Sequence, residues 1–178
     1  MGGNAMIARF AAAFLVTAFA TVPVVAETWP KLPKRNLTPG VINESLSLTK
    51  ICSTKWGQDA RAVTAKMKQD VIKAYHFRVS ACPLTKLKGK LVHRVEIDHL
   101  ISRDIGGADD TENLWPQCYE PTNKDKSKQA DGAHKKDRLE VELNKRICKA
   151  KATALLKQYQ RKIRTNWISL YHEIYGED

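Results

Sequence analysis

The chain has 178 residues, and 30 lysines and arginines outnumber 19 aspartates and glutamates, so its formal net charge is +11. This length suits one domain with a hydrophobic core and is short for two. The positive charge disfavours a basic partner and favours a polyanion, with nucleic acid the first candidate and anionic lipid or cell-wall polymer the alternatives.

Residues 1–26 have the pattern of a secretory signal peptide. A single cation, Arg9, precedes an almost unbroken apolar run over residues 10–25, and Ala26 supplies the small residue of a cleavage site. We therefore expect a mature start at Glu27 and a periplasmic or secreted protein. The run is short of the ~20 residues of a membrane span, so we expect no stable membrane insertion after cleavage.

The cysteine content predicts disulfide bonds. All four cysteines follow the signal segment: Cys52, Cys82, Cys118 and Cys148. Export brings them to an oxidising compartment, where two disulfides are the expectation. Four cysteines allow three pairings, and the residues alone leave the choice open. No Cys-x-x-Cys spacing is present, which disfavours a four-cysteine zinc site.

The first half of the mature chain reads as an arm, a helix and a basic loop. Residues 27–49 are rich in Pro, Asn, Ser and Thr, which predicts an extended arm before a single domain at 50–178. Apolar side chains recur every four residues in 60–75, the pattern of an amphipathic helix. A basic loop is expected over residues 84–89. It contains Lys86 and Lys88, and Lys90 follows it directly.

Two strands and two more helices follow. Polar and apolar residues alternate over 93–99, which predicts a half-buried strand, and 113–117 reads as an irregular returning strand. A glycine turn and a long polar connection join them into a hairpin. Residues 122–132 lack apolar anchors and predict a loop. Helical periodicity returns near residue 133 and again over 153–175. The order predicts an α+β fold.

The hairpin carries the residues suited to chemistry. Asp98 and His99 stand together at the end of the first strand, and Asn113 opens the second. Hydrolysis of a phosphodiester needs a base, a cation to neutralise the phosphate and fixed geometry. An imidazole titrates near neutral pH and suits the base, whereas a carboxylate is a hard ligand for a divalent ion. The amide of Asn113 is expected to hold the connecting loop by hydrogen bonds to its backbone.

This segment resembles the HNH nuclease family, whose motif runs Asp-His, a hydrophobic pair, a Gly-Gly turn and Asn-Leu. These pieces appear here as Asp98-His99, Leu100-Ile101, Gly106-Gly107 and Asn113-Leu114. A closer similarity is to small exported bacterial proteins of that superfamily, which add Asn-Leu-Trp-Pro-Gln, a Lys-Asp-x-Leu-Glu helix and a tryptophan in the last helix. Their counterparts here are residues 113–117, residues 136–140 and Trp167, and the similarity covers roughly residues 52–171.

The resemblance implies a ββα-metal fold, in which a helix crosses the hairpin and a metal lies between them, with further helices and disulfides around this core. It implies His99 as general base, Asn113 as the residue that orients it, and Asp98 as a ligand of Mg²⁺ or Mn²⁺, with Zn²⁺ as an alternative. The last residue of the motif departs from the family pattern. The candidates for it are Asn123, His134 and Asp137, of which we favour His134 and then Asp137 as metal ligands.

The resemblance further implies pairing of Cys52 with Cys148, which leaves Cys82 with Cys118. The expected function is an exported endonuclease that hydrolyses DNA or RNA, with nucleic acid held by the basic side chains Lys86, Lys88, Lys90 and Arg103. The alternative is a non-catalytic nucleic-acid-binding protein that retains the hairpin as structure. A third reading, a cationic protein of wall or membrane surface, leaves the motif unexplained. The sequence indicates no protein partner.

Overall fold

The computed structural model describes residues 29–122 and 130–176. Within these ranges the fold is α+β, as expected from the sequence. The helices are α1 (Leu48–Ser53), α2 (Ala65–Tyr75), α3 (Ala133–Ala150) and α4 (Thr153–Tyr175). The strands are β1 (Leu84–Leu87), β2 (Lys90–His93), β3 (Val95–His99) and β4 (Leu114–Cys118), and short 3₁₀ turns lie at Val79–Ala81, Arg103–Ile105 and Thr111–Asn113.

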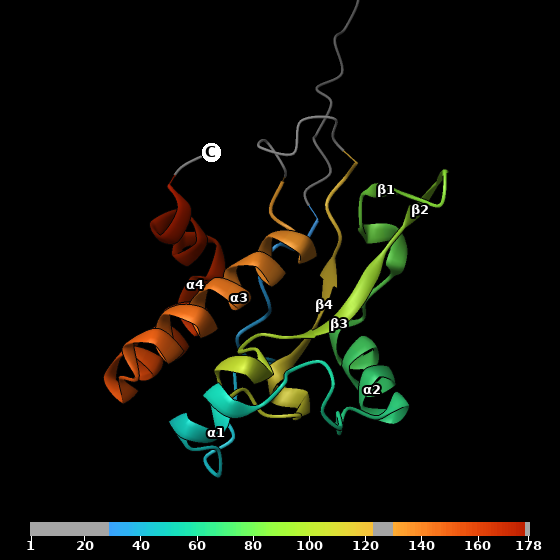
Figure 1. Cartoon of the computed structure of the whole chain (residues 1–178). Helices are drawn as coiled ribbons and strands as arrows, with labels where there is room; N and C mark the ends of the chain where they lie inside the picture. Colours follow the sequence, from blue (N-terminus) through green and yellow to red (C-terminus); the bar gives the residue numbers. More distant parts are fainter. Residues whose placement is uncertain (1–28, 123–129, 177–178) are drawn as a thin grey trace, which may run out of the picture.

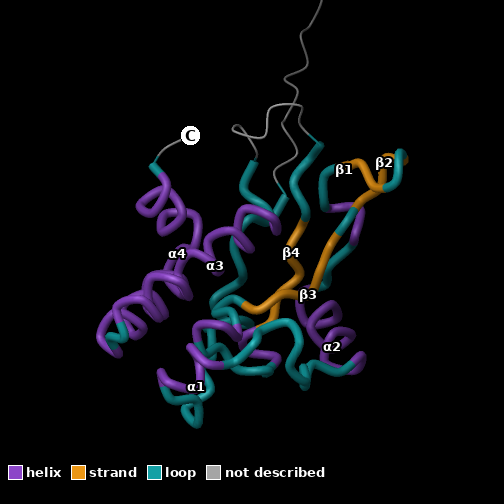
Figure 2. The backbone as a smooth tube through the Cα atoms, in the orientation of Figure 1, coloured by secondary structure: helices purple, strands orange, loops and turns teal. Residues whose placement is uncertain are grey.

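The strands form two antiparallel pairs, β1 with β2 and β3 with β4. The β3–β4 hairpin is the one expected from the sequence, with His99 opposite Leu114 in its register. It runs between α2 on one side and α3 with α4 on the other, as Figures 1 and 2 show. The end of β3 therefore lies at the centre of the fold, where helices from both halves of the chain approach it.

Two apolar clusters explain this layout. One is formed by facing stripes of α3 and α4 with the loop after β3, and its members include Ile101, Leu143 and Trp167. The other joins α2 to the hairpin through side chains that include Val71 and Trp115. Each helix buries one face and exposes the other, as its periodicity predicts. Packing of both clusters against the hairpin fixes the position of the strand ends.

The predicted arm over residues 27–49 is corrected by the structure. Its described part is packed into the domain, because Thr38 is fully buried and its Oγ1 donates to Leu114 O at 2.8 Å. Ile42 forms an isolated antiparallel bridge with Gly107, and the last two residues of the predicted arm belong to α1. The polar composition concealed these contacts, because the apolar residues that pack on the core, Leu37, Ile42 and Leu46, follow no regular spacing.

Three further elements differ from the sequence predictions. The predicted helix over 60–75 begins only at Ala65, where Thr64 Oγ1 caps it by accepting a hydrogen bond from Met67 N at 3.1 Å. The predicted basic loop over 84–89 is instead the β1–β2 hairpin, and His93 belongs to β2 rather than to β3. The last helix is present over the predicted range, but its backbone is non-helical at Asn166.

Two disulfides join distant parts of the chain, Cys52 with Cys148 and Cys82 with Cys118. This is the pairing that the resemblance implied. The first connects α1 to α3, and the second connects the segment before β1 to the end of β4. Such bonds are typical of proteins outside the reducing cytoplasm. Among the described residues, no helix is long and apolar enough to cross a membrane. The predicted signal peptide lies outside the described residues.

Candidate functional site

The alternation of β3 sends its last two side chains in different directions. His99 is buried, with 2% of its surface exposed, whereas the Asp98 carboxylate is 13% exposed. In the β3–β4 register Asp98 lies opposite Trp115 and His99 opposite Leu114. Successive side chains of a strand point to opposite faces. The two side chains of the predicted pair therefore meet different bonding partners, although both line one cavity.

Asn113 closes the loop between the two strands. Its Oδ1 accepts from Ile101 N at 3.0 Å, and its Nδ2 donates to Ile101 O at 2.9 Å and to Ala108 O at 3.0 Å. Gly107 permits this closure, because a Cβ there would lie 1.7 Å from Ile101 O. The expectation that Asn113 holds the loop by backbone hydrogen bonds is confirmed. The loop in turn carries the acid that faces His99.

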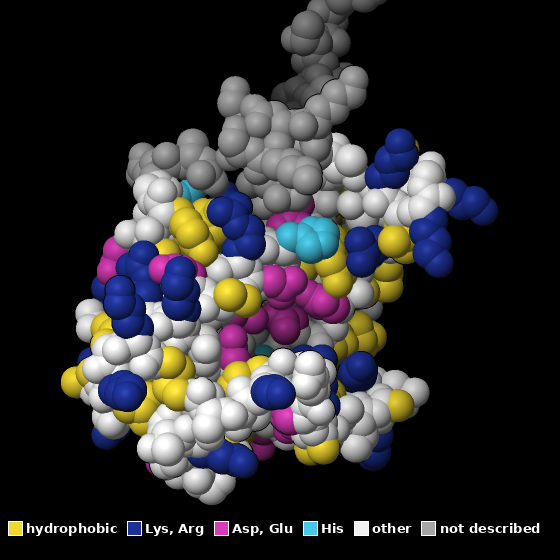
Figure 3. Space-filling view, viewed as in Figure 1, with side chains coloured by type: hydrophobic (Ala, Val, Ile, Leu, Met, Phe, Trp, Pro, Cys, Tyr) yellow, Lys and Arg dark blue, Asp and Glu magenta, His cyan; other side chains and the backbone are white. Residues whose placement is uncertain are grey.

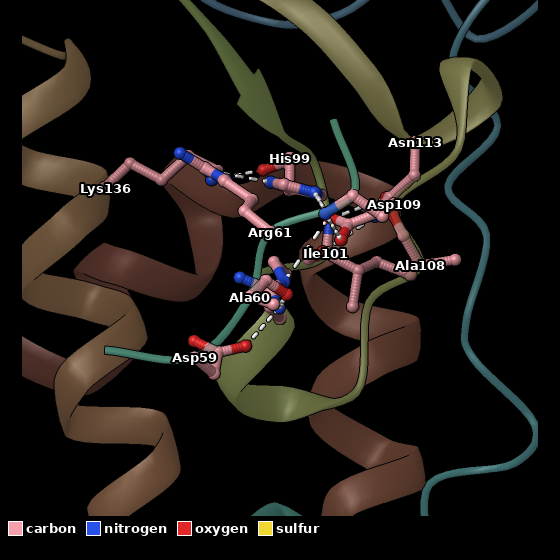
Figure 4. Close-up of polar contacts among 11 residues, drawn as sticks. Asp59, Ala60, Arg61, His99, Ile101, Ala108, Asp109, Asn113 and Lys136 are labelled. Atoms are coloured by element: carbon pink, nitrogen blue, oxygen red, sulfur yellow. Dashed lines mark hydrogen bonds and ion pairs between the residues drawn. The ribbon is translucent and has the colours of Figure 1, made fainter. Parts of the chain in front are cut away.

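Both nitrogens of the His99 ring have partners, as Figure 4 shows. Nε2 lies 2.7 Å from Asp109 Oδ1, and Nδ1 lies 3.2 Å from Nη2 of Arg61. A guanidinium only donates hydrogen bonds, so Nδ1 is the acceptor and Nε2–H donates to Asp109. Burial lowers the pKa of His99, although the charge of Asp98 and the bond to Asp109 oppose this. The ring is neutral at pH 7, and its lone pair at Nδ1 faces a cation.

A second arginine supports the acid behind His99. The Arg103 guanidinium pairs with Asp59, donates to Ala60 O at 3.0 Å and lies 3.3 Å from Asp109 Oδ1 through Nε. Burial raises the pKa of Asp109, but hydrogen bonds from Ala62 N and His99, together with the charge of Arg103, bring it below its ordinary value. Asp109 therefore stays ionised when it accepts from His99.

Lys136 of α3 lies on the Asp98 side of the strand end, fully buried. Its Nζ donates to Asp98 Oδ2 and to His99 O, both at 2.6 Å, and to Glu140 Oε1 one helical turn away. Burial alone would lower the pKa of Lys136, yet the charges of Asp98 and Glu140 raise it overall. Burial raises the pKa of Glu140 well above its ordinary value. A charged ammonium thus joins α3 to the end of β3.

These side chains surround a cavity of about 270 Å³. Its wall combines the His99 ring and two arginines with acidic side chains, and its lining includes Arg61, Asp98, His99, Arg103, Asp104 and Glu140. Figure 3 shows acidic side chains gathered near the centre of one face, with lysines and arginines around them. The cavity offers a base, donors for a phosphate oxygen and hard oxygen acceptors within one space.

The metal ligands implied by the resemblance are not assembled as a group. His134 is half-exposed and its Nδ1 bonds Glu120 Oε2 at 2.9 Å, while one oxygen of Asp98 accepts from Lys136. The pKa of Asp137 is raised, first by its burial and then by the negative charge of nearby Asp98. Over the described ranges, no three His, Cys, Asp or Glu side chains are arranged to hold a metal. These residues do not fit a preformed divalent-metal site, and Asn123 lies outside the described residues.

The predicted phosphate-binding residues fall in two places. Lys86, Lys88 and Lys90 lie on the β1–β2 hairpin, in exposed positions. Arg103 lies at the cavity, where its guanidinium pairs with Asp59 and Asp109. Its contact with nucleic acid stays a prediction.

Sequence reasoning missed most partners of the motif. Asp109 falls in the polar connection between the two predicted strands, where an acid ten residues after a histidine and beside a Gly-Gly turn is a usable signal. Arg61 carries no signal, because nothing in residues 60–63 points to a histidine 38 positions later. Lys136 and Glu140 share a helix face by their spacing, but the spacing does not indicate burial.

Comparison of the chain with family models, curated proteins and solved structures gives no match. The described structure by itself defines the class: a disulfide-bonded α+β protein with a buried His–Asp pair at a polar cavity. Any narrower assignment depends on the chemistry of that cavity.

Proposed function

We propose that this protein is an exported endonuclease that hydrolyses phosphodiester bonds of DNA, with RNA as a second substrate, and that His99 is its general base. One observation carries the proposal. A neutral imidazole at a polar cavity has an ionised carboxylate behind Nε2 and an arginine in front of Nδ1. That order suits proton removal from water beside an anionic group. The resemblance to HNH nucleases, the two disulfides and the positive charge point the same way.

In the proposed reaction the phosphate draws the Arg61 guanidinium from Nδ1, and a water molecule takes its place there. As the water oxygen bonds to phosphorus, its proton passes to Nδ1 and the bond from phosphorus to the leaving oxygen breaks. The leaving oxygen takes a proton from solvent. Asp109 stabilises the imidazolium by accepting from Nε2–H, and Asn113 keeps the loop that carries Asp109 in place.

A divalent cation, Mg²⁺ or Mn²⁺ with Zn²⁺ as the alternative, belongs to this proposal through the resemblance alone. When bound, such an ion would neutralise charge on the phosphate. The described side chains do not form its site in advance, so the steps above depend only on residues of the chain. Adding a chelator distinguishes hydrolysis that needs a divalent cation from hydrolysis by the protein residues alone.

We expect the purified mature protein to nick supercoiled plasmid in the presence of Mg²⁺ or Mn²⁺. The measurement is conversion to relaxed circles on a gel, with and without EDTA and with each ion restored. Loss of nicking with EDTA supports the divalent cation, whereas persistent nicking supports hydrolysis by the protein residues alone. No nicking of DNA and no cleavage of RNA with any ion would remove the endonuclease proposal.

We expect nicking to persist below pH 6.5, the ordinary pKa of a histidine. Burial holds the pKa of His99 below that value, so the base loses its lone pair only at lower pH. The same shift affects stability, because the unfolded chain binds a proton to this histidine before the folded protein does. Stability therefore falls as pH drops through 6.5 towards the folded value. A pH–rate profile with an acid limb at or above 6.5 contradicts this assignment.

A second function is favoured by one specific observation. His99 is 2% exposed and both its nitrogens have partners, which also suits a structural histidine in a non-catalytic nucleic-acid-binding protein. Duplex binding without cleavage, and unchanged when His99 is replaced, would support this alternative.

A further inference from the structure

The β1–β2 hairpin exposes apolar side chains that its packing on the rest of the protein does not explain. It projects from the start of β3, away from α1 (Figures 1 and 2). Three leucines on it are unusually exposed: Leu84 at 47%, Leu87 at 42% and Leu91 at 64%. Isolated exposed leucines are common on protein surfaces, but three on a hairpin with four residues in each strand are not required by the fold.

The strand register alternates these leucines with lysines. Lys86 lies opposite Leu91, and Leu87 lies opposite Lys90. Opposite residues of an antiparallel pair lie on the same face, and neighbouring pairs face opposite ways. Each face of the outer hairpin therefore presents one lysine beside one leucine. The tip adds Lys88, whose left-handed backbone (φ 48°) with Gly89 (φ 83°) makes the tight two-residue turn.

The base of the hairpin is held firmly. The disulfide of Cys82 with Cys118 ties the segment before β1 to the end of β4, and His93 Nδ1 lies 2.6 Å from Cys82 O. Thr85 is buried at 5% exposure, and its Oγ1 lies 3.3 Å from Thr122 Oγ1. Because β2 leads directly into β3, the hairpin keeps a set direction relative to His99.

We propose that this hairpin is a ribbon that enters a groove of duplex nucleic acid, with its lysines on phosphates and its leucines against the base edges or sugars. A two-stranded ribbon fits the major groove, and its positive charge complements the phosphates. The charged tip argues against insertion into a membrane. The inference deepens the proposed function, since it assigns the substrate contact of the same protein.

The length of chain between the hairpin and the cavity sets the size of duplex needed for a test. His99 lies eight residues after Leu91, so at most about 26 Å of extended chain joins them. This corresponds to roughly eight base pairs at ~3.4 Å per pair. A 16-base-pair duplex is therefore long enough to contact the hairpin and the cavity together.

The test is a binding experiment on the whole mature protein, with EDTA present and the duplex checked on a gel afterwards for cleavage. The fluorescence anisotropy of a labelled 16-base-pair DNA duplex is measured as protein is added, over a series of salt concentrations. One variant carries Lys86→Gln, Lys88→Asn and Lys90→Gln, where Asn tolerates the left-handed backbone. Its control carries Lys149→Gln, Lys151→Asn and Lys157→Gln, which remove equal charge from exposed sites and include a left-handed lysine. A third variant, Leu91→Thr, keeps the charge and a strand-forming side chain.

We expect the hairpin variant to weaken binding at least tenfold and to reduce the slope of log K against log salt by about 0.9 per lost contact, hence by ~2 to 3. Leu91→Thr should weaken binding severalfold without changing the slope. Equal effects of hairpin and control variants overturn the inference. So does hairpin-dependent binding to anionic phosphatidylglycerol vesicles with none to duplex. Hairpin-dependent binding by a protein that never nicks would retain this inference and remove the endonuclease proposal.

Discussion

Replacing His99 by alanine is expected to lower the nicking rate by ~10² to 10⁴, the usual loss with a general base. Duplex affinity should hardly change, because the hairpin lysines lie on another part of the surface. The change removes the acceptor at Nδ1 and the donor to Asp109 together. Nicking rates and anisotropy isotherms, measured on protein shown to be folded by circular dichroism, give the two readouts.

Two variants make this result specific. Asp109→Asn can present an NH₂ group to Nε2, which would move the ring proton to Nδ1 and abolish the base without altering the size of the side chain. We expect a rate loss comparable with that of His99→Ala. His76→Asn changes an exposed histidine at the left-handed end of α2 and should leave the rate unchanged. Near-normal nicking by His99→Ala would show that His99 is not the base.

Replacing Lys136 by methionine is expected to destabilise the fold by ~3 to 5 kcal/mol, because it leaves carboxylates without their buried counter-ion. The methionine chain fills the same space, so the loss reports charge rather than volume. Burial raises the pKa of Glu140. Its carboxylate, buried without a counter-ion, should therefore account for most of the lost stability. Urea unfolding followed by circular dichroism measures the change.

Protonation of Glu140 removes its buried charge, so the pH dependence of the stability loss tests whether this charge causes it. A carboxyl with a raised folded pKa costs stability as pH rises above its ordinary value, and the Lys136→Met penalty should be smaller at pH 5 than at pH 8. Adding Glu140→Gln should recover part of the loss, giving a non-additive double-mutant cycle. Lys145→Met, on an exposed position of α3, should change stability by less than about 0.5 kcal/mol. A similar loss from both lysines would contradict the buried-charge explanation.

Local patterns in the sequence predicted the parts of the site that are adjacent along the chain. The alternation before Asp98, the glycine turn and Asn113 defined a hairpin that the structure contains. The stripes of α3 and α4 were visible because a helix that packs on one side needs apolar residues at regular spacing. The basic segment over 84–89 was predicted as a loop because its leucines and lysines satisfy no one-sided pattern, although the segment pairs as strands.

By itself, the sequence determined the fold class, the main hairpin, the last two helices and the Asp-His-Asn motif, since each depends on spacing within one segment. Only the tertiary structure decided which charges meet that motif. Arg61 reaches His99 from the loop before α2, and Lys136 reaches Asp98 from α3. No periodicity encodes such contacts, because they depend on how separate elements pack and on which charges that packing removes from water.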